Sequence, residues 1–242
     1  MGALAITAGA ASAAVVYKNL PPLSVKDTGS QCLAGCGVTS FGGVVGLGGK
    51  DRHITEVIAE VSSFSCQYGI YSNDSCETVK KAQYSEQVTL KIYAPKVGEE
   101  NEPGALLDES TVSALVPYKP SPNVTGCPLT SEGRGWGSEC HIGDLAKVRF
   151  AGLSAFAEEK KVVLEVELPQ DGQATDVNKS GDPNIVNVAT NNPYNGLTET
   201  FEGGPAPSKG FDPYPSEAVI NGASETGWTG FQPAFEVQAA AA

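Results

Sequence analysis

Apolar and polar residues alternate in several short stretches of this chain. In residues 88–94 (VTLKIYA) apolar side chains occupy every second position, and residues 162–168 (VVLEVEL) repeat the pattern with Glu165 and Glu167 on the other face. Successive side chains of a β-strand point to opposite faces, so a period of two predicts strands with one buried face. Alternation or short apolar runs predict further strands at 44–47, 54–61, 111–116, 147–150, 185–189 and 235–239.

No segment carries a helix-length apolar stripe with a period of 3.6 residues. The best helical candidate, residues 154–161, is short and flanked by predicted strands, so we expect a connection there. Long connections are expected at 99–109, 118–139, 171–184 and 190–226. Many short strands separated by Gly and Pro predict an all-β fold. We expect a single antiparallel β-sandwich of jelly-roll type, spanning residues 14–242, with long loops pinned by disulfides.

The six cysteines fall into three local groups along the chain. Close spacing favours pairing between neighbours, because the reduced chain brings such ends together at the least entropic cost. The sequence leaves the connectivity open. A metal site is the alternative, but there is no C-x-x-C motif and the two histidines lie far apart. The predicted disulfides are Cys32–Cys36, Cys66–Cys76 and Cys127–Cys140.

The first residues predict export. Residues 1–16 are small and apolar, and Ala11-Ser12-Ala13 offers a signal-peptidase site. This run is too short to span a membrane. We interpret residues 1–13 as the remnant of a signal peptide and expect a secreted, extracellular chain that starts near Ala14, without membrane insertion. An apolar N-terminal strand is the competing interpretation.

The net charge of −12 and the pI near 4.6 limit the classes of partner that we expect. Such a surface repels phosphate backbones and anionic lipid, so nucleic acid and membrane surfaces are not expected as partners. Solubility is the simplest reason for the charge, and the functional alternatives are cation binding or a saline environment.

The order of several segments is familiar. Residues 40–64 (SFGGVVGLGGKDRHITEVIAEVSSF) precede the paired Cys66 and Cys76, then come residues 88–122, with VTLKIYAP and VPYKPSP, and finally residues 227–239 (GWTGFQPAFEVQA). This order resembles a group of uncharacterised secreted or cell-surface bacterial proteins, common in actinobacteria. The resemblance implies a β-sandwich with paired-cysteine hairpins and brings no known activity.

One acidic stretch resembles the first half of a calcium loop. Asp176, Asn178, Ser180 and Asp182 alternate with other residues, and a glycine stands at the sixth position for the turn. Calcium prefers such oxygen ligands. The bidentate acid that closes a calcium loop is absent, so a polar hairpin loop is the alternative. Calcium is the only cofactor that the sequence suggests.

Exposed aromatic residues suggest a glycan ligand. A flat ring offers an apolar face to a sugar, and Trp136 lies inside the loop that the Cys127–Cys140 disulfide would close. We predict that Trp136 and Tyr118 contact the ligand. The alternative is that these rings fill the open ends of the sandwich.

Motifs for catalysis are missing: the sequence has no G-x-S-x-G elbow, no H-E-x-x-H and no phosphate-binding glycine loop. We therefore assign no catalytic residue. The predicted function is a secreted or cell-surface, non-catalytic binding or structural module with a glycan as its ligand. Two alternatives stay open: a glycan-active hydrolase or lyase on the same sandwich, and a self-assembling surface or fibre subunit. The oligomeric state is left open.

Overall fold

A computed structural model describes residues 13–22, 24–33, 36–70, 74–130, 133–168, 178–180, 184–195, 200–201 and 204–241. Within these ranges the regular elements are all β-strands, so the all-β prediction is confirmed. The strands are β1 (Ala14–Lys18), β2 (Thr28–Gln31), β3 (Ser40–Gly46), β4 (His53–Ser63), β5 (Gln83–Lys96), β6 (Glu99–Pro117), β7 (Leu129–Thr130), β8 (Gly133–Arg134), β9 (Asp144–Ala151), β10 (Lys161–Glu167), β11 (Val186–Asn195), β12 (Thr200–Phe201), β13 (Glu217–Ile220), β14 (Ala223–Thr226) and β15 (Phe235–Ala240).

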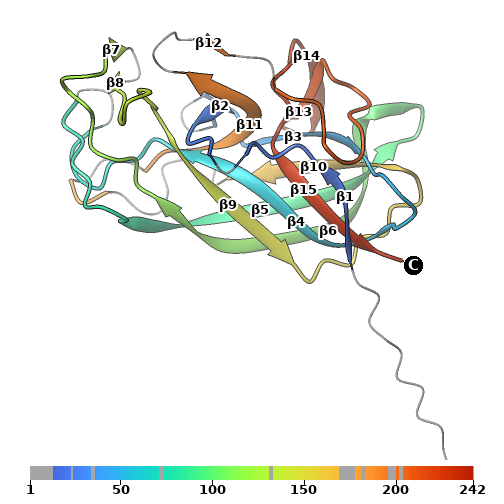
Figure 1. Cartoon of the computed structure of the whole chain (residues 1–242). Helices are drawn as coiled ribbons and strands as arrows, with labels where there is room; N and C mark the ends of the chain where they lie inside the picture. The colour runs from blue at the N-terminus through green and yellow to red at the C-terminus, as the bar shows by residue number, and fades with distance from the viewer. Residues whose placement is uncertain are drawn as a thin grey trace, which may run out of the picture.

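Eight of these strands form two antiparallel sheets with jelly-roll order (Figure 1). Sheet one runs β1-β15-β4-β9, and sheet two runs β3-β10-β5-β6. The last strand, β15, therefore lies between β1 and β4. Along these eight strands the chain crosses between the sheets after β1, β3, β4, β6, β9 and β10. Because this wrapping defines the jelly roll, the predicted sandwich type is confirmed.

The remaining larger strands extend the two sheets. In sheet one β4 pairs along one edge with β9, while its other edge is shared by β15 and β11. Strand β2 adds to β11. In sheet two the β13–β14 hairpin joins the free edge of β3. These additions matter for function because β11 and the segment before β13 frame the larger groove described below.

The predicted connections at 99–109 and 190–226 are wrong. Residues 190–226 contain the end of β11 and strands β12, β13 and β14. Residues 99–109 belong to β6, which pairs with β5 along almost its whole length. Segment 99–109 is an edge strand whose residues are all exposed or half-buried, so it lacks the apolar alternation that reveals a strand with one buried face. A two-residue turn at Val97 and Gly98 closes the hairpin.

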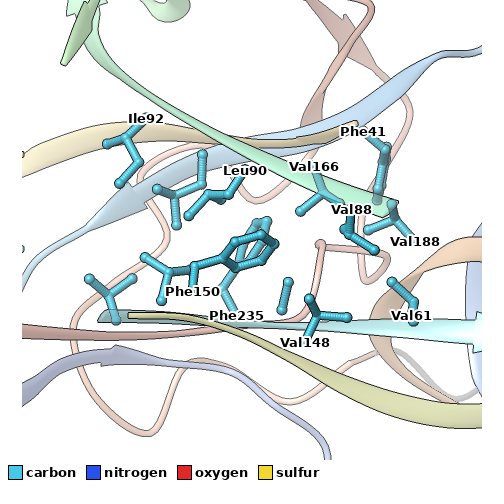
Figure 2. Packing of buried hydrophobic residues seen from close by; sticks show 14 of the residues in the cluster. Phe41, Val61, Val88, Leu90, Ile92, Val148, Phe150, Val166, Val188 and Phe235 are labelled. Atoms are coloured by element: carbon cyan, nitrogen blue, oxygen red, sulfur yellow. The ribbon is translucent and has the colours of Figure 1, made fainter. Parts of the chain in front are cut away.

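The core lies between the two sheets. Figure 2 shows Phe150 and Phe235 of sheet one at its centre, facing Leu90 and Val166 of sheet two. All four side chains are fully buried. Burying aromatic rings of this size is the main source of stability in such a sandwich.

The three predicted disulfides are all present: Cys32 with Cys36, Cys66 with Cys76, and Cys127 with Cys140. No cysteine of the described residues is free. Cys127–Cys140 closes the segment that contains the β7–β8 hairpin, which lies at the end of the molecule far from the C-terminus (Figure 1). The predicted signal-peptide remnant, residues 1–13, lies outside the described residues except for its last residue.

Candidate functional site

Residues 208–211 join the two sheets along one side of the sandwich. The N–H of Ser208 donates to the carbonyl of Lys18 in sheet one at 2.7 Å, and Phe211 exchanges two backbone hydrogen bonds with Gly46 in sheet two at 2.8 and 2.9 Å. The Pro- and Gly-rich segment 204–215 is therefore fixed at both sheets.

A groove of about 410 Å³ opens beside this segment. Its walls come from four separate parts of the chain: the end of β1, strand β11, segment 204–215 and the turn before β15. The lining residues are Asn19, Asn191, Gly204, Pro205, Ala206, Pro207, Gly210, Phe211, Asp212, Pro215, Gly230 and Gln232. The groove is thus lined by side-chain amides, proline rings, one phenyl ring and one carboxylate.

Phe211 is the aromatic ring of the groove. Its side chain is 43% exposed, although the backbone on both sides of it is fixed. The ring lies against Gly46, where an added Cβ would come within 2.6 Å of the ring carbons. Only a glycine at position 46 of β3 leaves room for this contact. The contact holds the large apolar ring of Phe211 in one position at the surface.

Side-chain amides hold the walls of the groove together. Asn19 accepts a hydrogen bond from the N–H of Phe235 at 2.7 Å and donates to the carbonyl of Pro233 at 3.0 Å. Asn191 donates to the carbonyl of Pro205 at 3.0 Å, and Gln232 donates to the carbonyl of Glu217 at 3.1 Å. These bonds bridge distant segments and make the groove rigid before any ligand arrives.

Asp212 is the only titratable side chain among the described residues that line the groove. Burial raises its pKa, while the N–H of Tyr214, which donates to its carboxylate at 3.0 Å, acts in the opposite direction. General acid–base cleavage of a glycosidic bond uses two carboxyl groups. The described lining of the groove supplies one such group.

A second pocket, of about 190 Å³, lies beside β4 and β9 and has a different character. Its lining includes two carboxyl groups, Glu60 and Asp144, and two ammonium groups, Lys26 and Lys147. Burial raises the pKa of Glu60 to about 7, although Lys147 lies 3.5 Å away and acts against this shift. Burial, followed by the charge of Asp27, raises the pKa of Asp144 to about 6.

Asp27 fixes the wall of this second pocket. It is fully buried and accepts hydrogen bonds from the backbone N–H groups of Thr28, Ile142 and Gly143, each at 2.9 Å. Burial raises its pKa, and the three N–H groups lower it because they stabilise the carboxylate. The connection between β1 and β2 is thereby held against the start of β9.

The predicted ligand residues lie in different clusters. The Trp136 ring packs on His141 with 4.9 Å between ring centroids, and its indole N–H donates to the carbonyl of Gly143 at 2.8 Å. Tyr118 is only 8% exposed and packs on Tyr84 at 4.6 Å. Tyr118 therefore belongs to the interior, as the alternative interpretation of these rings expected, and the two rings form no shared platform. A ligand at Trp136 stays a prediction.

The predicted calcium loop is described only in part, because Asp176 and Asp182 lie outside the described residues. Asn178 accepts a hydrogen bond from the N–H of Ser180 at 2.8 Å and donates to the carbonyl of Gly69 at 2.7 Å. Ser180 in turn accepts one from the N–H of Gly69 at 2.8 Å. Both residues thus fix this turn to the Cys66–Cys76 hairpin. Calcium binding stays a prediction, and the described residues contain no group of three or more His, Cys, Asp or Glu suited to a metal ion.

Comparisons with known proteins add no relative: no protein-family model, curated protein or solved structure matches the chain. The resemblance to the actinobacterial group therefore stays a prediction. Among the described residues there is no helix long and apolar enough to cross a membrane. The three disulfides are compatible with a secreted protein.

Proposed function

We propose that this chain is an extracellular, non-catalytic jelly-roll module that binds a glycan in the groove beside segment 204–215. The observation that carries the proposal is the exposed Phe211 ring, held against Gly46 at the groove and accompanied by one carboxylate. A sugar ring presents C–H groups that pack on an aromatic face and hydroxyl groups that donate to carboxylate oxygens.

The rigidity of the groove supports the same function. A site that is ordered before binding loses less conformational entropy when the ligand arrives. The amide bonds of Asn19 and Asn191 provide this order. The disulfides support an extracellular setting, since such bonds persist in oxidising compartments.

Binding of the labelled full chain to a glycan array tests the proposal. We expect Phe211→Ala to weaken binding to any recognised glycan about tenfold, since an aromatic contact contributes about 1.4 kcal/mol. Phe156→Ala is the matched control, because Phe156 is equally exposed at 45% and does not line the groove. Each array is run with and without a calcium chelator, and loss of binding with chelator would support a calcium bridge at 176–182.

Two outcomes would contradict this function. The first is the absence of binding in both conditions. The second is equal weakening by Phe211→Ala and Phe156→Ala, since the groove would then have no special part in recognition.

The second pocket favours one alternative, a glycan-active hydrolase. Two carboxyl groups with raised pKa values in one pocket are a frequent feature of acid–base catalysis. No aromatic side chain is among the described residues that line this pocket. Release of reducing ends from a glycan that binds, abolished by Glu60→Gln, would favour the hydrolase over the binding module.

A further inference from the structure

A buried lysine, a buried asparagine and a buried glutamate gather at one end of the interior, away from both pockets. Lys119 and Asn184 are fully buried, and Glu86 is 4% exposed. Lysine and glutamate are almost never fully buried unless they are paired. Neither the Oδ1 nor the Nδ2 atom of Asn184 has a hydrogen-bond partner. Each unsatisfied polar atom costs about 1–3 kcal/mol, so this amide calls for an explanation.

Ser65 brings Lys119 and Asn184 together. The N–H of Lys119 donates to the carbonyl of Ser65 at 2.9 Å. The residue after Asn184, Ile185, donates its N–H to the hydroxyl of Ser65 at 2.6 Å. Strand β11 pairs with β4 through Val186 and Ser63, and this register continues to place Asn184 opposite Ser65. Lys119 and Asn184 therefore both adjoin the same residue, and their burial requires that both side chains run into the interior.

Tyr84 places Glu86 in the same region. The Tyr84 hydroxyl lies 2.9 Å from the hydroxyl of Ser65, and its ring packs on Tyr118, the residue before Lys119. Glu86 follows Tyr84 by two positions on the same inward face of β5. Its charge contributes to the raised pKa of Tyr84, after the larger effect of burial. The three buried residues thus lie in one region of the interior, beside the rings of Tyr84 and Tyr118.

We propose that Lys119 and Asn184 become joined by an intramolecular isopeptide bond, with Glu86 transferring the protons. Exclusion of water favours the neutral amine of a lysine, which is a nucleophile, and the protonated form of a carboxyl group. Lys119 Nζ attacks Cγ of Asn184, and the new C–N bond forms as the Cγ–Nδ2 bond breaks. The carboxyl of Glu86 donates a proton to the departing Nδ2 and takes one from Nζ, so ammonia leaves. No oxidant, reductant or cofactor is needed.

The product removes the cost of the unsatisfied Asn184 amide, because the new bond replaces that amide. The buried amine of Lys119 becomes part of the same neutral amide. The link would tie the chain after β6, in sheet two, to the start of β11, in sheet one. A covalent bond between the sheets limits their separation, as a disulfide does by restricting the unfolded chain.

The intact mass of the full chain tests this inference. After reduction and alkylation of the six cysteines, we expect a mass lower than that of the sequence by one ammonia, about 17 Da, and a branched peptide containing residues 119 and 184. Lys119→Met and Glu86→Gln should each restore the full mass. A wild-type chain with its full sequence mass would overturn the proposal, whatever the variants do.

Asn192→Ala provides the matched control. Asn192 is also fully buried, and both atoms of its amide also lack a partner. We expect this variant to retain the loss of one ammonia. If the loss disappears in Asn192→Ala, or if it persists in Lys119→Met, then the bond between Lys119 and Asn184 does not exist. Circular dichroism of each variant shows whether the fold is kept.

Discussion

Phe150→Ala lowers the free energy of unfolding by about 3–5 kcal/mol, because truncating a buried phenylalanine removes its burial and leaves a cavity. Phe150 is fully buried in β9 and lies beside Phe235 at the centre of the core (Figure 2). Both sheets contribute to this cluster, so little collapse is available to refill the space. Urea denaturation followed by tryptophan fluorescence and circular dichroism measures the change.

Leu115→Ala is the control for Phe150→Ala. Leu115 is a large apolar residue of β6 that is 66% exposed. We expect its truncation to change the free energy of unfolding by less than about 0.5 kcal/mol. Equal effects of the two substitutions would mean that the interior does not lie between the sheets as described.

Glu60→Gln stabilises the protein at alkaline pH. The pKa of Glu60 is raised from 4.5 to about 7, so the native state holds a proton that the unfolded chain releases at lower pH. Ionisation of Glu60 therefore lowers the free energy of unfolding as pH rises from about 4.5 to 7. Above pH 7 the full loss is about 3 kcal/mol. We expect Glu60→Gln to gain that amount at pH 8 and to match the wild type at pH 4.

Denaturation curves at pH 4, 6 and 8 measure this effect. Asp144, whose pKa is also raised, remains in the variant and keeps part of the pH dependence in the same direction. Glu158→Gln serves as the control, because Glu158 is exposed, and it should leave the pH dependence unchanged. Destabilisation by Glu60→Gln at pH 8 would show that the ion pair with Lys147 outweighs the cost of burial.

The alternating pattern was sufficient to predict the central strands. Residues 88–94 lie within β5, residues 162–168 lie within β10 except for Leu168, and each of the other six predicted stretches overlaps a strand of the same sheets. This succeeded because these strands bury one face against the opposite sheet, and a half-buried face forces a period of two. Cysteine spacing was also informative, since all three loops are short enough to close locally.

Strands without a strong apolar face were missed. Residues 190–226 were expected to be a connection, yet they contain the end of β11 and the β13–β14 hairpin. The signal for this hairpin is Asn221-Gly222, since both residues adopt positive φ values, 50° and 79°, as a type I′ turn requires. An Asn-Gly pair after a short apolar run, here residues 218–220, is a strong local sign of a hairpin, so the sequence did carry the information.

The groove could not be predicted from sequence. Asn19, Asn191, Phe211 and Gln232 lie far apart along the chain, and only the pairing of β1, β11 and β15 brings their segments together. The glycan prediction instead rested on the largest aromatic side chains. It selected Tyr118, which the sandwich buries, because a tyrosine in the interior and one at the surface look alike in a single sequence.

Amide chemical-shift mapping by NMR, with a glycan that the array identifies, tests the proposed site most directly. We expect the largest shifts at Asn191, Phe211, Asp212 and Gln232, around segment 204–215. Shifts centred on Trp136 and the Cys127–Cys140 loop, or on the pocket of Glu60 and Asp144, would contradict the assignment of binding to the groove.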